Sequence, residues 1–330
     1  MSSASGTILL DVNANQPVGV YEGSAATAAV LAIVAALGRP VMVSDYLDAQ
    51  GGTYWTESSY PMSNWAKAMP SDTQYMFGFP VITTAGSDSF AVPSPAAATQ
   101  LANLLSGASD AAINAALANI AKYCPGALVR PMWEQNAQSN SMSLKYFTAS
   151  QLAAIFQYVA PMIRAHGLFT VWNPLDTVAG QDAISTTTLA CYPGDAFVDL
   201  VGPDAYPQLW VPAGALNPNE TNYPAPLGMW NAYLTQGGAY NPAAPDNGKY
   251  SLEWWVGFAK AHGKPIVVCE TGCWKTATTL PAEGGTGDDP TWIENFLNWG
   301  KTNNALITLF DLWNGNSPNA AAAAVSLLGV

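Results

Sequence analysis

The segment Lys264-Pro265-Ile266-Val267-Val268-Cys269-Glu270-Thr271-Gly272 is a short apolar run that ends in a single carboxylate. Pro265 opens the run, β-branched residues fill it and Gly272 closes it, which predicts a buried strand. Because buried parallel strands are almost continuously hydrophobic, Glu270 is the feature that needs an explanation. It is either an ion-paired or solvated acid at a strand terminus, or a functional carboxylate.

A second segment has the same form. Its sequence is Ala127-Leu128-Val129-Arg130-Pro131-Met132-Trp133-Glu134-Gln135-Asn136, an apolar strand that ends in Glu134. Two carboxylates at the C-terminal ends of two strands are the minimal set of groups for glycoside hydrolysis. Glu134 and Glu270 are therefore candidates for a pair of catalytic carboxylates.

Strand and helix patterns alternate along the whole chain. Strands are expected at residues 18–21, 40–48, 75–82, 127–136, 168–174, 197–207, 264–272 and 306–314. Helices are expected at 25–37, on both sides of a break near Gly107 within 96–123, at 150–166, 252–262 and 290–301, and in the tail to 330. The alternation predicts a parallel sheet, and eight units favour an α/β fold of the (β/α)8 TIM-barrel type, a single domain over residues 1–330. No G-x-G-x-x-G follows the first strand, which argues against a dinucleotide site.

Composition and charge exclude several classes of partner. The net charge is -12, which argues against binding to nucleic acid or to an anionic membrane. No uninterrupted apolar stretch of about 20 residues predicts a membrane span. Residues 1–6 lack the basic and apolar regions of a signal peptide, while the low-charge surface favours an exported protein. We therefore expect an extracellular monomer whose signal peptide is absent from this sequence or which uses another export route.

Cysteine and histidine are scarce. The four cysteines are Cys124, Cys191, Cys269 and Cys273, without a C-x-x-C pair, and their disulfide status is left open. With only His166 and His262 in addition, a zinc site is not expected, and no metal or organic cofactor is required. Both histidines stand before a glycine at a predicted helix end, where they are expected to contact helix carbonyls.

In a barrel of this type, the side chains at the C-terminal strand ends converge on one face. The residues predicted there are Tyr21, Glu22, Asp45, Asp48, Arg130, Trp133, Glu134, Asn136, Trp172, Asn173, Asp204, Tyr206, Glu270, Asp311, Trp313 and Asn314. An even spacing along the strand places Arg130 on the same face as Glu134, where it either supports catalysis or forms a structural ion pair. Arg130 could pair with either carboxylate and hold the nucleophile ionised, and Tyr206 could donate a hydrogen bond to that nucleophile. Ordinary packing is the alternative for Tyr206 and Trp172.

These motifs, taken in order, resemble glycoside hydrolase clan A and most closely family 26, the β-mannanase-like enzymes. The matching segments are 18–23, 130–136, 171–174, 199–206 and 264–272. The resemblance implies that Glu134 is the acid/base, that Glu270 is the nucleophile and that Tyr206 contacts it. It also implies that Trp172 and Trp313 are sugar platforms. Trp133 departs from the family, which has His before the acid/base, and from most of the clan, which has Asn; this indicates a divergent member with a different glycan.

The leading hypothesis is a retaining endo-glycoside hydrolase that cleaves a β-linked polysaccharide by double displacement. The substrate-binding residues would be Tyr21, Arg130, Trp133, Asn136, Trp172, Asn173, Asp204, Tyr206 and Trp313. The long segment 208–249, with Trp210, Tyr223, Trp230, Tyr233 and Tyr240, would form one wall of the cleft. The alternatives are a non-catalytic glycan-binding barrel and a barrel hydrolase acting on a non-sugar substrate. The sugar, its linkage and endo against exo action are not determined by the sequence.

Overall fold

The computed structural model describes residues 18–21, 41–47, 62–82, 96–136, 142–175, 188–205, 209–210, 230, 234, 249–272, 283–284 and 290–310. The expected helices at 25–37 and in the tail after 310 lie outside these residues, as does most of segment 208–249. Within these residues the chain forms ten strands, six α-helices and one 3-10 turn.

Eight parallel strands form one sheet in the order predicted from the sequence. They are β1 Val18–Tyr21, β2 Val41–Tyr46, β3 Gln74–Phe79, β4 Leu128–Pro131, β5 Phe169–Trp172, β6 Leu200–Val201, β8 Val267–Thr271 and β10 Leu306–Phe310. Each of the eight expected strand segments overlaps one of them. Two further short strands, β7 Leu209–Trp210 and β9 Glu283–Gly284, form a separate antiparallel pair.

The sheet closes on itself between β6 and β8. Parallel bridges join Val201 to Ile266 and Asp204 to Glu270 across this seam. The amide of Val201 donates to the carbonyl of Pro265 at 3.0 Å, and that of Ala205 donates to the carbonyl of Glu270 at 2.9 Å. Closure of eight parallel strands confirms the predicted (β/α)8 barrel.

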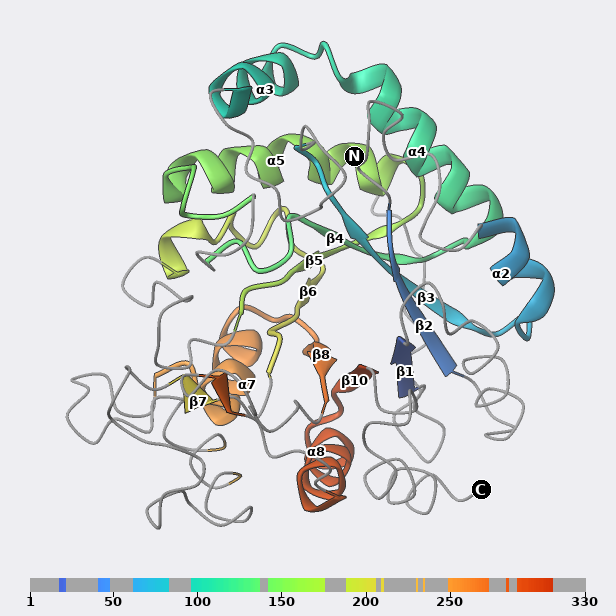
Figure 1. The fold of residues 1–330 in the computed structure, drawn as a ribbon, viewed down its shortest axis with the longest axis vertical. Coiled ribbons are helices and arrows are strands. Elements are labelled where there is room, and N and C mark those ends of the chain that lie inside the picture. The colour runs from blue at the N-terminus through green and yellow to red at the C-terminus, as the bar shows by residue number, and fades with distance from the viewer. Residues whose placement is uncertain are drawn as a thin grey trace.

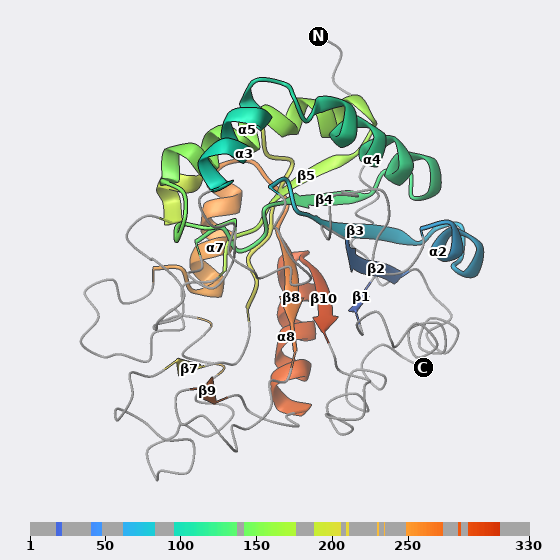
Figure 2. The same cartoon turned by 45° about the horizontal axis from the view of Figure 1, so that its top comes forward.

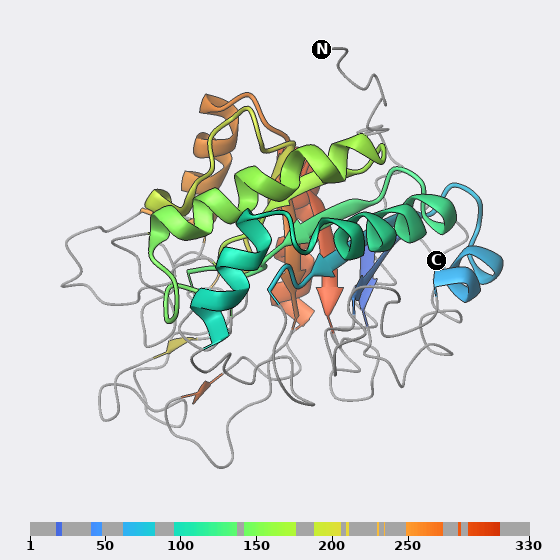
Figure 3. The same cartoon turned by 90° about the horizontal axis from the view of Figure 1, so that it is seen from above.

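Helices surround the strands (Figures 1 and 2). They are α2 Met62–Ala68, α3 Ala96–Leu105, α4 Asp110–Tyr123, α5 Ala149–Ala165, α7 Leu252–Ala261 and α8 Pro290–Asn303, with a 3-10 turn η1 at Thr188–Cys191. Figure 3 shows α3, α4 and α5 next to one another on one side of the barrel. None of the described helices has the length and apolarity to cross a membrane.

Local sequence signals set most helix ends. Thr148 caps α5 with a capping box that includes Gln151, and Gly167 follows this helix with a φ of +72°. Gly107 has a φ of +83° and separates α3 from α4, which confirms the predicted break. Helix α2 is not among the helices expected from the sequence. Burial of Met62 and Trp65 against the barrel and α4 stabilises this helix, so tertiary packing decides it.

The barrel has two apolar layers. Inside the ring, the strands contribute Met42, Met76, Leu128, Val171, Leu200, Val267, Cys269 and Leu306. Outside the ring, alternate residues such as Val43, Phe77, Val129 and Ile307 pack against the helices. This alternation leaves the positions after the inner apolar layer, toward the C-terminal strand ends, to polar side chains.

Two glycines should respond in opposite directions to alanine. A Cβ on Gly202 would lie 2.5 Å from Sγ of Cys269 and 2.6 Å from Cγ1 of Val171, inside the closed ring. We expect Gly202→Ala to cost about 1–3 kcal/mol, because it overpacks a core that cannot expand. A Cβ on Gly257, within α7, meets no heavy atom within 4 Å, so Gly257→Ala should be stabilising by up to about 1 kcal/mol. Urea unfolding of both variants tests this, and equal shifts would contradict the interior position of Gly202.

Candidate active site

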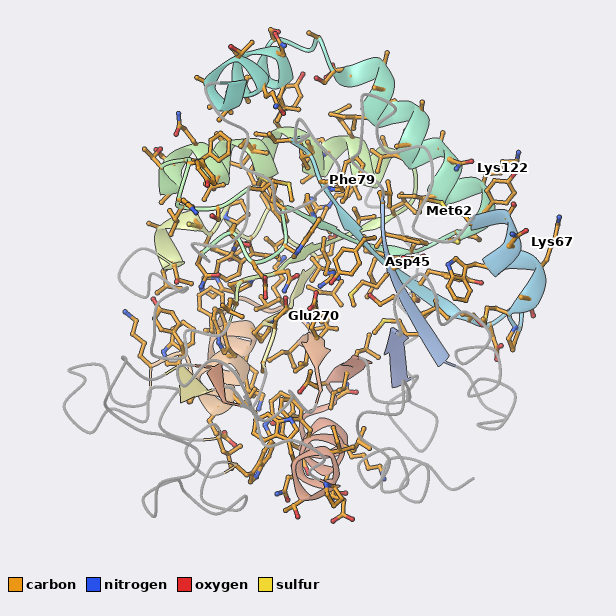
Figure 4. The ribbon with its side chains drawn as sticks, in the orientation of Figure 1. Asp45, Met62, Lys67, Phe79, Lys122 and Glu270 are labelled. Carbon is orange, nitrogen blue, oxygen red and sulfur yellow. The ribbon has the colours of Figure 1, made fainter. Side chains whose placement is uncertain are left out.

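Glu270 reaches the barrel interior because β8 contains a bulge. Leu306 pairs with Val267 and Ile307 with Val268, but the next pair joins Leu309 to Thr271. Two steps along β10 therefore match three along β8, which leaves one extra residue near Cys269 and Glu270. A bulge allows two consecutive side chains to point to one side, so Glu270 turns inward beside the interior Cys269. Figure 4 shows Glu270 among the strands in the middle of the molecule, far from Lys67 and Lys122 at its edge.

Arg130 is the buried cation of this site. It lies on β4 with a fully buried side chain, and its Nη1 is 2.5 Å from Oε1 of Glu270 and 3.8 Å from Oδ1 of Asp204. Burial alone lowers the pKa of the guanidinium, but the Tyr46 phenol and the two carboxylates raise it well above the ordinary value. Arg130 therefore stays charged and partners Glu270, which is 7% exposed.

Asn173 connects the supports of the two catalytic candidates. Its Oδ1 accepts from Nη1 of Arg130 at 3.0 Å, and its Nδ2 donates to the carbonyl of Gly202 at 2.6 Å. Its backbone carbonyl accepts from the amide of Glu134 at 2.7 Å. One residue on the exit of β5 thus orients the cation that holds Glu270 and fixes the backbone that carries Glu134.

Glu134 stands on a tight turn after β4. The strand ends at Pro131, and Met132 and Glu134 both have left-handed backbones, with φ of +57° and +50°. Such conformations are costly for residues other than glycine and cluster at functional sites. The even-spacing argument for Arg130 and Glu134 therefore does not apply, because the chain has left the strand; the turn brings Glu134 to the same place.

Gln135 and Asn136 hold this turn. With its amide oriented to match its neighbours, Gln135 donates to the carbonyl of Asn173 at 2.7 Å and accepts from Nε1 of Trp172 at 2.7 Å. The side chain of Asn136 accepts from the amide of Leu175 at 2.7 Å and donates to its carbonyl at 2.8 Å. These bonds stabilise the backbone around Glu134 against its unfavourable φ.

Three carboxylates meet at the barrel mouth. Glu134, Asp204 and Glu270 each place an oxygen within 4.8 Å of the others. Three oxygens could offer ligands to a cation, but the Arg130 charge already lies beside two of them and would repel it. The set is better matched to acid, base and nucleophile chemistry, in which neighbouring carboxyl groups hold different protonation states.

Asp204 is fully buried beside this cluster. Burial, followed by the charge of Glu270, raises the pKa of the Asp204 carboxyl well above its ordinary value, although Arg130 opposes the shift. The site therefore favours the neutral, protonated form of Asp204 over its charged form.

The raised pKa of Asp204 predicts a pH-dependent stability. The unfolded chain releases this proton near 3.8, whereas the folded protein keeps it to a higher pH. Between these values the folded state binds more protons, so the free energy of unfolding falls as pH rises. Asp204→Asn removes this loss, and we expect its stability relative to the parent chain to rise from about pH 4 to pH 7. Urea unfolding at several pH values measures the effect, and parallel curves for the two proteins would contradict it.

Two of the residues predicted to bind substrate do not face the site. The Trp172 indole is 1% exposed and packs outside the ring against Trp255 and Phe258, so it cannot stack on a sugar. Trp172 alternates with the inward residues Val171 and Asn173, and strand alternation sends it outward. Asn136 is fully buried, and its side-chain amide forms hydrogen bonds with the backbone of Leu175 and with the Thr188 hydroxyl.

Other predicted residues fall into three groups. Arg130, Asn173, Asp204, Glu134 and Glu270 converge as expected. Asp45 faces outward, where its Oδ2 accepts from Nε1 of Trp65 on α2 at 3.0 Å. Tyr206, Trp313, Glu22, Asp48, Asp311 and Asn314, together with the side chain of Tyr21, lie outside the described residues.

Trp230 of the predicted cleft wall and the two histidines differ from expectation. Trp230 is buried against Trp292 and Phe296 of α8 rather than presented to a cleft. The rings of His166 and His262 contact Asn114 and Asp195, so the expected contacts with helix carbonyls do not describe their side chains. Cys124, Cys191 and Cys269 are buried.

Tyr46 belongs to the site although the sequence did not predict it there. The Tyr46 hydroxyl donates to Oε1 of Glu270. Its signal is the alternation along β2, in which Met42 and Tyr46 point to the interior while Asp45 points away.

The fold and the site define a class: a closed (β/α)8 barrel with acidic side chains converging at the C-terminal ends of strands four and seven of the ring. No protein-family model matches the chain. No curated protein matches it either.

Solved structures do match, and among them are glycoside hydrolase family 26 β-mannanases. The catalytic domain of a Bacillus sp. JAMB-750 endo-β-1,4-mannanase has a TM-score of 0.54 at 16% identity, covering 84% of this chain and 69% of that one. The Bacteroides ovatus β-mannanase BoMan26A has 0.51 at 13%, covering 86% and 76%. A modular Cellulomonas fimi endo-β-1,4-mannanase has 0.52 at 16%, covering 78% of this chain and 53% of its own. The chain therefore shares the fold of these enzymes, at identities that fit the divergent resemblance predicted from the sequence.

Proposed function

We propose that the chain is a retaining endo-glycoside hydrolase that cleaves a β-linked polysaccharide. The observation that carries the proposal is the approach of Glu134 and Glu270 oxygens to within 4.8 Å of each other at the barrel mouth. Retaining enzymes hold their two carboxyl groups about 5–5.5 Å apart, whereas inverting enzymes need about 6.5–9.5 Å to admit a water molecule. The shorter spacing supports attack by a carboxylate.

The roles follow from the environments of the two groups. Glu270 receives hydrogen bonds from Arg130 and Tyr46, which stabilise its charged form and suit it to be the nucleophile. Glu134 is only half-buried and stands on the turn after β4, from which it would protonate the leaving oxygen. In the second step Glu134 would take a proton from water, which attacks the anomeric carbon and releases Glu270.

The proposal also includes a substrate class, a domain organisation and an extracellular location. The structural relatives are named as endo-β-1,4-mannanases, which makes β-1,4-linked mannan the first polysaccharide to test. Trp133 in place of the family His supports a different glycan, so other β-linked polysaccharides are candidates as well. We propose further that residues 1–330 form one catalytic domain that acts as an extracellular monomer, with Tyr21, Tyr206 and Trp313 among its sugar-binding residues.

Reducing-end release from a panel of polysaccharides tests the proposal. The panel contains β-mannan, β-glucan, xylan, arabinan and bacterial exopolysaccharides, and proton NMR of the first product reports its anomer. We expect release from one class, with a β-configured product that later mutarotates. An initial α product would contradict the retaining mechanism. Retention of a glycan without cleavage would favour the non-catalytic binding barrel.

A further inference from the structure

Tyr46 contacts two charged groups of the site. Its hydroxyl donates to the same Oε1 of Glu270 that accepts from Nη1 of Arg130. The Arg130 guanidinium also lies over the Tyr46 ring, 5.0 Å from its centroid. Burial raises the pKa of the Tyr46 phenol well above its ordinary value, so the hydroxyl remains a donor at any working pH.

The Tyr46 ring packs over position 78 of the neighbouring strand β3, where only a glycine leaves room for it. Tyr46 on β2 pairs with Gly78 on β3, which in turn pairs with Arg130 on β4. A Cβ on Gly78 would lie 2.3 Å from Cδ1 and 2.7 Å from Cε1 of Tyr46. The missing side chain of Gly78 thus lets the ring cross over β3 toward Arg130 and Glu270.

Trp133 packs against the same ring. The two rings meet edge to face, with centroids 5.0 Å apart and an interplanar angle of 63°. The Trp133 side chain is 6% exposed, and its Cε3 is 3.3 Å from the position of a Gly78 Cβ. Trp133 immediately precedes Glu134, so the turn that carries one catalytic candidate also supports the group bonded to the other.

We propose that Tyr46 is a catalytic residue that orients Glu270 and stabilises its negative charge, with Trp133 and Gly78 as positioning residues that act through Tyr46. The inference rests on the proposed glycoside hydrolysis and deepens it. It also assigns Trp133 a role on the nucleophile side, in place of the expected contact with sugar.

The chemistry predicts which step depends most on Tyr46. In the first step, a Glu270 oxygen bonds to the anomeric carbon, the glycosidic bond breaks and the Glu134 proton passes to the leaving oxygen. In the second step, water attacks, its proton passes to Glu134, and the ester bond breaks so that Glu270 regains its charge. The Tyr46 hydrogen bond strengthens as that charge returns, and therefore favours the second step.

The test compares Tyr46→Phe with Tyr75→Phe. Tyr75 is a buried tyrosine on the neighbouring β3, whose ring packs against Phe77, and it serves as the matched control. The probes are the polysaccharide cleaved in the panel and 2,4-dinitrophenyl β-mannobioside, β-cellobioside and β-xylobioside. We expect Tyr46→Phe to lower kcat about 10²-fold or more, as for loss of one donor to a developing charge. KM should fall with kcat, and an initial burst of dinitrophenol should report the accumulated glycosyl-enzyme.

The positioning residues are tested by coupling. Trp133→His and Gly78→Ala should each lower kcat in the parent chain, but each should have little further effect in the Tyr46→Phe background. Gly257→Ala is the control for the added methyl group, because nothing lies within 4 Å of it. If Gly78→Ala does not fold, Trp133→His alone supplies the coupling measurement.

The outcomes separate this inference from the proposed function. Normal kcat and no burst in Tyr46→Phe, in a chain that Glu270→Gln inactivates, overturns the role of Tyr46 and leaves the hydrolase intact. Additive effects of Trp133→His and Tyr46→Phe overturn the role of Trp133. If the parent chain cleaves no polysaccharide or aryl glycoside, the proposed function and the catalytic role of Tyr46 fall together.

Discussion

Glu270→Gln should reduce kcat on the cleaved polysaccharide by about 10⁴-fold or more, the largest effect expected of any single change in this chain. The amide is nearly the same size as the carboxylate and can still accept from Arg130 and Tyr46, so the fold should persist. It lacks the charge needed to attack the anomeric carbon. The measurement is the steady-state rate of reducing-end release at saturating substrate, with circular dichroism to verify the fold.

Two matched variants make this result specific. Glu294→Gln changes an exposed glutamate on α8 and should leave kcat unchanged. Glu134→Gln should lose activity on polysaccharide but keep it on dinitrophenyl glycosides in the first step, because that leaving group needs no proton. Azide should restore turnover to Glu134→Gln but not to Glu270→Gln. Equal activity of Glu270→Gln and the parent chain would remove Glu270 from the mechanism.

Arg130→Met should destabilise the protein by about 3–5 kcal/mol and abolish activity. The methionine fills a similar volume but removes the cation. Nη1 of Arg130 now lies 2.5 Å from Oε1 of Glu270 and 3.8 Å from Oδ1 of Asp204. Both side chains are buried, so water cannot replace Arg130. Urea unfolding measures the loss of stability, and reducing-end release measures the loss of activity.

Arg164→Met is the control for Arg130→Met. Arg164 pairs with Asp199 at 2.8 Å, but its side chain is 33% exposed, so water can solvate the remaining carboxylate. Its cost in stability should be clearly smaller, and kcat should stay within a few-fold of the parent chain. A cost for Arg130→Met no larger than for Arg164→Met would contradict the view of Arg130 as the buried counterion of the site.

Most of the architecture was predictable because it depends on local patterns. Apolar runs alternate with amphipathic segments along the chain, and all eight expected strands are present in the closed sheet. Thr148, Gly167 and Gly263 mark helix ends through capping and positive φ, which are properties of the residues themselves. Glu134 and Glu270 were found because a charge at the end of an apolar strand is conspicuous.

What the sequence by itself determined is therefore the order of the strands, the closed barrel and the strand ends that carry the acidic residues. Only the tertiary structure decided which side chains face the site. The bulge at Glu270 depends on pairing with β10, and the left-handed turn at Glu134 depends on bonds to Asn173. The Tyr46 side chain faces the site and the Trp172 side chain faces away from it, because successive side chains of a strand point to opposite faces and pairing with neighbouring strands sets which face is inside. Such facing and register arise from contacts between residues far apart in the chain, and no local window of sequence contains them.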